Sequence, residues 1–178
     1  MARKMLLMIA AVFVLSILAF AAAESILVSA ADKPNFAGSW TMDRARSFGL
    51  PANMTQTMTV TQKDDQIDVE TKLIQPGNER VQKDTYILDG KEHEFTPPVP
   101  ANAPPNTPAP TGKRTSNWLP SGNGITVTDV VTSQTPKGPA TNQTVRKWTI
   151  SGQGELIIDM YIDNANGSFE AKRIFKRS

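Results

Sequence analysis

The sequence of 178 residues contains no cysteine and only one histidine, His93. Without cysteine there is no disulfide, no thiolate metal site and no lipid-modified cysteine. Metal sites normally need two or more nitrogen or sulfur ligands, and a Ser-His-acid triad needs a histidine beside a serine and an acid. His93 lies in the polar stretch 91–94, which offers neither arrangement. We therefore expect no metal, no cofactor and no catalytic residue, and we expect that the protein is not an enzyme.

An excess of charge of one sign is also missing. The chain has 19 basic and 17 acidic residues, and the basic residues form no continuous block. Proteins that bind nucleic acid or anionic membrane surfaces usually concentrate positive charge on one face. We expect neither kind of partner.

The N-terminus has the pattern of a secretory signal peptide. Arg3 and Lys4 precede an apolar run over 5–23, and small residues follow. We expect a helical leader over 1–30 that is cleaved after Ala30, or after Ala23, so that the mature protein is secreted or periplasmic and spans no membrane. The alternative is an uncleaved anchor, because the run approaches the roughly 20 residues that cross a bilayer. The remaining residues, 31–178, have the length of one domain.

The mature sequence is a series of short segments that alternate between apolar and polar residues. Met58 and Val60, for example, alternate with Thr57, Thr59 and Thr61. A period of two with one apolar face predicts half-buried β-strands. We expect strands at 36–43, 54–62, 66–74, 79–88, 92–96, 113–119, 124–132, 142–151, 155–162 and 168–176.

The connections between these segments have the composition of hairpin turns. Asp89-Gly90 and the segments 76–78, 121–124 and 152–154 supply the Gly and Asn residues that tight turns require. Tight turns pair neighbouring strands, and closing the sheet removes its exposed edges. We therefore predict an all-β fold, an antiparallel up-and-down meander closed into a barrel of eight to ten strands. A β-sandwich is the alternative. Residues 44–53 have room for one helical turn.

A proline-rich stretch over 97–112 interrupts this pattern. Seven of the thirteen prolines lie within 97–110. Proline lacks a backbone donor, so the stretch cannot form a central strand. We expect a long loop between strands, either a tolerated surface insertion or a lid over a cavity.

Gly38 and Trp40 lie in the first predicted strand, and Arg173 lies in the last. This arrangement resembles the calycin superfamily, which includes the lipocalins and the fatty-acid-binding proteins. In those families a Gly-x-Trp strand starts the barrel, and a basic residue of the last strand stacks on the Trp. The resemblance implies that Arg173, or Lys172 as the alternative, covers Trp40 and closes the barrel.

Residues 35–48, 85–92 and 146–150 are further similar to a group of exported bacterial lipocalin-like proteins. The lipocalin disulfide, the second lipocalin signature and a C-terminal helix are missing from the sequence. The resemblance therefore implies a fold and no particular ligand.

The position of Arg173 also has a physical explanation that does not depend on the family resemblance. Arg173 shares a strand face with Phe169, Ala171 and Phe175, so the alternation directs it toward the apolar side. An unpaired charge there is costly, and stacking on an indole while donating to carbonyls offsets that cost. We expect its role to be mainly structural.

The same alternation predicts which residues point into the barrel. The candidate ligand-binding residues are Arg114, Trp118, Arg146, Arg173, Met58, Phe95, Ile158 and Met160. Arginines inside an apolar barrel can receive an anion through charge-assisted hydrogen bonds. Arg146 and Arg173 resemble the late-strand arginines of fatty-acid-binding proteins, although Phe175 stands where those proteins have a Tyr. The alternative for Arg146 is a pair with Asp129.

These observations favour non-catalytic binding of a small hydrophobic or amphipathic ligand, including an anionic one. A barrel of about eight strands either fills itself with side chains or holds one small ligand. The alternative is a periplasmic protein-interaction module, such as a calycin-type protease inhibitor, with a protein partner at the Pro-rich loop or the N-terminal segment.

Overall fold

The computed structural model describes residues 33–49, 51–99, 108–135 and 138–178. In these residues the fold is all-β, with ten strands and one 3₁₀ turn, η2 (Arg44–Arg46). The strands are β1 (Gly38–Met42), β2 (Thr55–Lys63), β3 (Gln66–Gln75), β4 (Asn78–Ile87), β5 (Glu92–Phe95), β6 (Thr111–Trp118), β7 (Gly124–Thr135), β8 (Gly138–Ile150), β9 (Leu156–Asn164) and β10 (Gly167–Arg177). The predicted fold class is confirmed, and η2 falls where one helical turn was expected.

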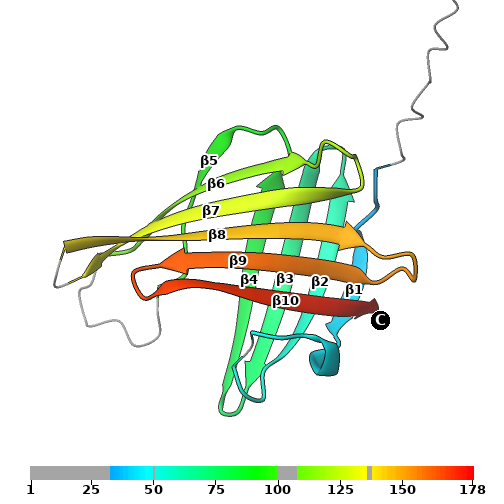
Figure 1. Cartoon of the computed structure of the whole chain (residues 1–178), viewed down its shortest axis with the longest axis horizontal. Helices are drawn as coiled ribbons and strands as arrows, with labels where there is room; N and C mark the ends of the chain where they lie inside the picture. The colour runs from blue at the N-terminus through cyan, green and yellow to red at the C-terminus, as the bar shows by residue number, and fades with distance from the viewer. Residues whose placement is uncertain (1–32, 50, 100–107, 136–137) are drawn as a thin grey trace, which may run out of the picture. The chain divides into compact units, whose positions relative to one another are not determined.

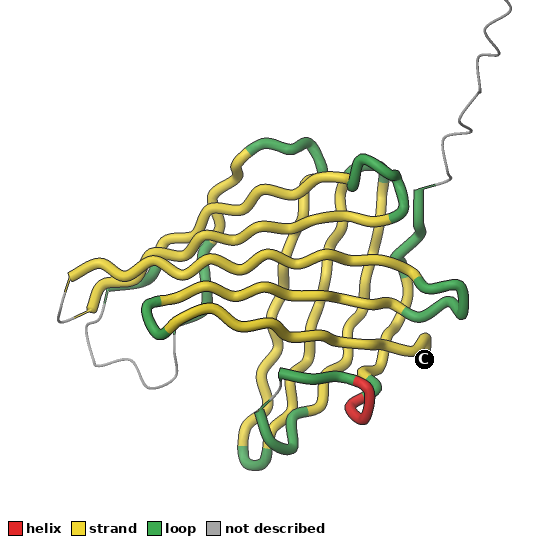
Figure 2. Tube along the Cα trace, in the orientation of Figure 1, coloured by secondary structure: helices red, strands yellow, loops and turns green. Residues whose placement is uncertain are grey.

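The ten strands form one antiparallel sheet in the order β4-β3-β2-β1-β10-β9-β8-β7-β6-β5. Nearly every strand pairs with its sequence neighbour, and the first strand pairs with the last. The sheet curls into a barrel, in which β1–β4 cross β6–β10 at a steep angle (Figures 1 and 2). The sheet is continuous through the β1–β10 ladder, so the alternative of two separate sheets is wrong.

The alternating residues sort onto the two faces of the sheet as predicted. In β2, Met58 and Val60 are buried while Thr57 and Thr59 are exposed. Large apolar side chains fill one end of the barrel interior, which buries Phe36, Trp40, Trp148, Leu156 and Phe175 almost completely. Burial of these apolar faces is the main force that closes the sheet.

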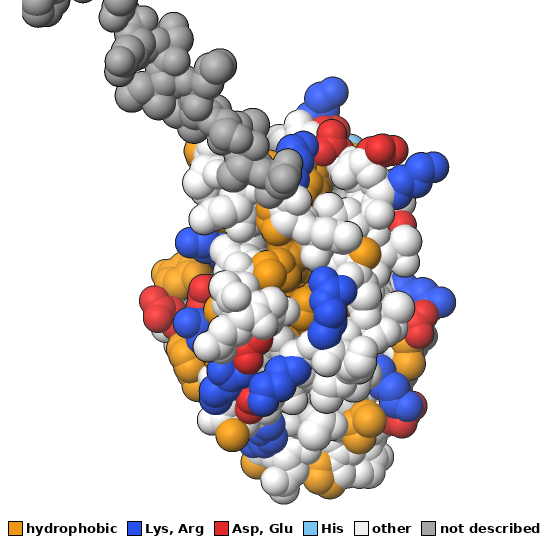
Figure 3. All heavy atoms as spheres, turned by 90° about the vertical axis from the view of Figure 1, so that its right-hand side faces the viewer, with side chains coloured by type: hydrophobic (Ala, Val, Ile, Leu, Met, Phe, Trp, Pro, Cys, Tyr) orange, Lys and Arg blue, Asp and Glu red, His pale blue; other side chains and the backbone are white. Residues whose placement is uncertain are grey.

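The N-terminal segment closes the filled end. The Phe36 ring stacks on Trp118, with 6.4 Å between centroids, and Lys33 Nζ lies 4.5 Å from the centroid of Trp118. Lys33 also pairs with Asp65 in the β2–β3 turn at 3.1 Å. On the side of the molecule shown in Figure 3, Lys and Arg side chains are interspersed with Asp and Glu.

The cation over Trp40 is Arg177, so the prediction that Arg173 or Lys172 covers this indole is wrong. Trp40 and Arg177 are partners in the β1–β10 ladder, and the guanidinium carbon lies 4.6 Å from the ring centroid. β1 ends at Met42, opposite Phe175, so Arg173 lies beyond the end of β1. Gly38 has a φ of +137°, a backbone conformation that other residues rarely adopt, which explains the glycine of the predicted motif.

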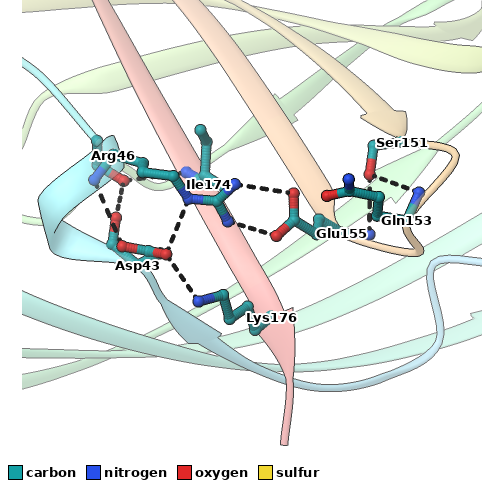
Figure 4. A network of polar contacts seen from close by, with 8 residues as sticks. Asp43, Arg46, Ser151, Gln153, Glu155, Ile174 and Lys176 are labelled. Atoms are coloured by element: carbon teal, nitrogen blue, oxygen red, sulfur yellow. Dashed lines mark hydrogen bonds and ion pairs between the residues drawn. The ribbon is translucent and has the colours of Figure 1, made fainter.

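An ion-pair network holds the loop after β1 against the end of the barrel (Figure 4). Asp43 caps η2 and pairs with Lys176 of β10 at 2.9 Å and with Arg46 at 2.9 Å. Arg46 in turn pairs with Glu155 in the β8–β9 turn. The contacts with Lys176 and Arg46 lower the pKa of Asp43 to about 2. The network therefore ties three separate parts of the chain together.

Two predicted segments fall wholly or partly outside the described residues. The leader over 1–30 and the centre of the Pro-rich loop, 100–107, are not described. The loop is shorter than predicted at its C-terminal end, because Thr111 and Gly112 pair with Thr132 and Val131 as part of β6. In the described residues no helix has the length and hydropathy of a membrane span, and no group of three or more His, Cys, Asp or Glu is arranged to hold a metal ion.

Candidate functional site

A cavity of about 260 Å³ lies inside the barrel, at the end away from Phe36. Its apolar lining residues include Met54, Met58, Leu73, Trp148, Ile158 and Met160. Its polar lining residues include Gln56, Gln82, Asp84, Tyr86, Arg146 and Arg173. A site with a partly apolar lining and a few convergent polar groups has the character of a small-ligand pocket.

Five of the eight candidate ligand-binding residues line this cavity. They are Met58, Arg146, Ile158, Met160 and Arg173. Their positions follow from the registers, because Arg146 lies opposite Met160, and Ile158 lies opposite Arg173. Three adjacent strands, β8, β9 and β10, therefore bring both arginines to one wall. A role of these residues in binding stays a prediction.

Arg173 is a buried cation without a carboxylate partner among the described residues. Its guanidinium donates from Nη1 to Phe48 O at 2.9 Å and to Lys172 O at 3.3 Å, and from Nη2 to Gly49 O at 3.4 Å. Burial lowers the pKa of Arg173 to about 10. Carbonyl oxygens solvate the guanidinium but leave its charge uncompensated.

Arg146 is only partly used by its neighbours. It donates from Nη1 to Asp129 Oδ2 at 2.7 Å, which is the pair considered as the alternative from the sequence. No described residue accepts a hydrogen bond from its Nε or Nη2. Its side chain is 24% exposed, so part of the guanidinium remains accessible in the cavity wall.

Arg114 lies outside the cavity and is fully engaged in a buried ion-pair network. It binds Asp129 through two bonds, Nε to Oδ1 at 2.6 Å and Nη2 to Oδ2 at 3.0 Å, and it reaches Asp84 Oδ1 at 2.9 Å. Burial opposes the charge of Arg114, but the bond to Asp129 and the negative charges of Asp129 and Asp84 together outweigh it, so the pKa of Arg114 is raised. Burial also opposes the charge of Asp129 and by itself would raise its pKa. The bond to Arg114 and the charge of Arg146 reverse this effect, so the pKa of Asp129 is lowered.

Phe95 and Trp118 also lie outside the cavity, contrary to their prediction as cavity-lining residues. Phe95 packs against Arg114, with 4.2 Å from its ring centroid to the guanidinium carbon, and against Gly112. Trp118 lies at the filled end, where its Nε1 donates to Asp65 Oδ1 at 2.9 Å. The alternation predicted the correct face of β6 for Trp118. It could not predict the position of Trp118 along the barrel axis, which we call its height in the barrel.

The polar lining residues contributed by β4 were not predicted from the sequence. Gln82, Asp84 and Tyr86 alternate inward, and Gln82 Nε2 donates to Asp84 Oδ2 at 2.8 Å. Burial raises the pKa of Tyr86 to about 12. An inward face made of Gln and Asp has no hydrophobic signal, and only the period of two counted back from Tyr86 would have identified it.

No protein-family model matches the sequence, and no curated protein matches it. Among solved structures, the chain is similar to the crystal structure of zebrafish ileal bile acid-binding protein complexed with cholic acid. The TM-score is 0.49 and the sequence identity 18%, over 80% of this chain and 98% of that chain.

Proposed function

We propose that this protein binds a small amphipathic anion in the barrel cavity, with the acidic group at Arg173 and Arg146 and the apolar part against the methionine-rich wall. The observation that carries the proposal is Arg173, a buried cation in the cavity wall that no described carboxylate neutralises. A ligand carboxylate would supply the missing negative charge.

The expected energy of this contact is large enough to select anions. A hydrogen bond to a charged group contributes about 1.5–3 kcal/mol, which corresponds to a factor of roughly 10–100 in affinity. The unused donors of Arg146 add a second contact on the same wall. Met54, Met58 and Met160 give the apolar part of the lining an adaptable shape, because methionine side chains are flexible and polarisable.

The cavity volume limits the size of the ligand. At about 260 Å³ the cavity is slightly smaller than the roughly 300–1,000 Å³ of pockets for drug-sized ligands, so it favours a ligand of about a dozen heavy atoms. A medium-chain carboxylate has this size and polarity. A larger amphipathic ligand would require the cavity to widen.

Calorimetric titration with decanoate tests the proposal, with decanol as the neutral control of equal chain length. We expect saturable binding of one decanoate per protein, at least tenfold tighter than decanol. Equal affinity for the acid and the alcohol would contradict the anionic part of the proposal, and no binding of either would contradict the proposal as a whole.

We further propose that the protein is exported and belongs with the bacterial lipocalin-like proteins that its sequence resembles. The supporting observation is the leader, in which Arg3 and Lys4 precede the apolar run over 5–23. Mass spectrometry of the mature protein from its own host tests this point. A mature chain that starts at Ala31 or Glu24 is expected, and an intact Met1 terminus would contradict export with cleavage.

A further inference from the structure

The barrel is closed in two different ways on its two sides. On one side β1 and β10 form a backbone ladder. On the other side the sheet order ends with β4 and β5, and no ladder between β4 and either β5 or β6 is present in the described residues. We call this line between β4 and β5 the seam. Since each backbone hydrogen bond contributes about 1 kcal/mol, the seam is the line along which the barrel opens most easily.

Arg114 forms the main bridge across the seam. From β6 it donates to two groups of β4, the Asp84 carboxylate at 2.9 Å and the Thr85 carbonyl at 3.3 Å. One end of the seam is further held by the bond from Gly90 N to Ser116 O at 3.0 Å, next to the short β4–β5 connection. The seam is therefore tied at the filled end of the barrel and depends on one side chain further along.

The bridge is firmly held on one side only. Arg114 makes two bonds to Asp129 of β7, and its guanidinium lies between the rings of Tyr86 and Phe95, at 4.7 and 4.2 Å from their centroids. If β4 moves away, Arg114 keeps its charge partner in Asp129. When the seam opens, the buried arginine therefore stays paired, and Asp84 loses its ion pair but keeps the hydrogen bond from Gln82 Nε2 at 2.8 Å.

Asp84 separates two hollows of the molecule. It lines the barrel cavity, and together with Arg114, Lys83 and Glu94 it lines a second hollow of about 380 Å³ in the seam. Displacement of the contact between Asp84 and Arg114 would connect the barrel interior with the outside through this hollow.

We propose that the Asp84–Arg114 contact is a lateral gate through which the ligand enters and leaves the cavity. This inference rests on the proposed function, because it assigns the route to the same site. The gate opens by movement of β4 and β5 apart, while the β1–β10 ladder keeps the barrel together.

The test is a covalent bridge across the seam. Lys83→Cys and Glu94→Cys place thiols on β4 and β5 at the two walls of the seam hollow, and a short bis-maleimide then links them. The chain has no native cysteine, so the link is unique. Ser39→Cys with Thr59→Cys is the control pair, because these exposed residues face each other on the hydrogen-bonded β1–β2 ladder.

Decanoate binding is followed in stopped flow by tryptophan fluorescence, before and after linking of the same double variant. We expect the seam link to slow association and dissociation at least tenfold while the Kd changes less than threefold, and the control link to leave both rates unchanged. Unchanged rates with intact affinity would overturn the gate alone. Failure of the unlinked protein to bind decanoate at equilibrium would overturn the proposed function and the gate with it.

Discussion

Arg177 lies over Trp40, and these two residues join the last strand of the barrel to the first. They are direct partners in the β1–β10 ladder, with 4.6 Å between the guanidinium carbon and the ring centroid. Arg177 Nη1 also donates to Ala37 O at 2.7 Å, while Trp40 Nε1 donates to Phe36 O at 2.9 Å. The N-terminal segment is therefore held by both members of the pair.

Replacement of Arg177 should weaken this closure. Cation–π contacts at exposed sites contribute about 0.5–1 kcal/mol, and the bond to Ala37 O adds a similar amount, so we expect Arg177→Ala to lower the free energy of unfolding by about 1–2 kcal/mol. Urea denaturation measures the change. Lys147→Ala, at an exposed position of β8, is the control. Equal stability of the two variants would show that Arg177 does not contribute to closure.

The ion-pair network around Asp43 should make stability dependent on pH in the acid range. The pKa of Asp43 is about 2 in the folded protein, below its ordinary value of 3.8, because of its contacts with Lys176 and Arg46. The carboxylate therefore stabilises the fold above pH 4, and this contribution is lost as the pH falls from about 4 to about 2. We expect Asp43→Asn to be less stable than the unmodified protein at pH 6, with most of this difference gone at pH 2, where about half of the Asp43 carboxyl groups are protonated.

Thermal unfolding at several pH values follows this difference. Asp64→Asn changes an exposed turn residue with φ of +52°, a conformation that Asn accepts, and serves as the control. A stability difference between Asp43→Asn and the unmodified protein that does not change between pH 6 and pH 2 would rule out the network as its source.

The start of β7 should not tolerate a larger residue. A Cβ at Gly124 would collide with the carbonyl oxygen of Trp148 and would lie 2.9 Å from Leu119 Cδ1. Overpacking costs about 1–3 kcal/mol, so we expect Gly124→Ala to lower the free energy of unfolding by an amount in or above this range. Gly152→Ala is the matched control, because nothing lies within 4 Å of its Cβ position. Denaturation midpoints that agree for the two variants would mean that β7 and β8 pair less closely than described.

Asp129 should be far more important for stability than an aspartate on the outer face. Removal of its charge leaves the buried Arg114 and the half-buried Arg146 without their shared partner, which costs about 3–5 kcal/mol. Asp159 pairs with Lys172 at 3.1 Å on the exposed face of β9, and such a pair contributes about 0–1 kcal/mol. Chemical denaturation should therefore show a large loss for Asp129→Asn and a small one for Asp159→Asn. A similar loss for both would contradict the buried network.

Most strands could be predicted from the sequence because the alternation of apolar and polar residues is clear. The β7–β8 hairpin is longer than predicted, because β7 continues to Thr135 and β8 begins at Gly138. The sequence near the tip of this hairpin is polar and contains proline, so it was predicted to be a loop. The register between distant strands could not be derived in the same way. β10 extends past the end of β1, so the basic residue over Trp40 is four positions later than expected.

The cavity was predictable only in part for a related reason. The alternation identifies the inward face, and Met58, Arg146, Ile158, Met160 and Arg173 were found in this way. It does not give the height of a residue in the barrel, which separates these residues from Trp118. It also fails where the inward face is polar, as at Gln82 and Asp84 of β4.

Titration of the Arg173→Gln variant with decanoate and decanol tests the central claim most directly. Glutamine keeps a donor for the carbonyls of Phe48 and Gly49 but removes the charge, and Lys147→Gln removes a charge from the outer face of β8 as a control. We predict that Arg173→Gln loses at least tenfold in decanoate affinity, with decanol affinity within threefold, and that Lys147→Gln keeps both. An undiminished preference for decanoate in Arg173→Gln would contradict the assignment of Arg173 as the anion site.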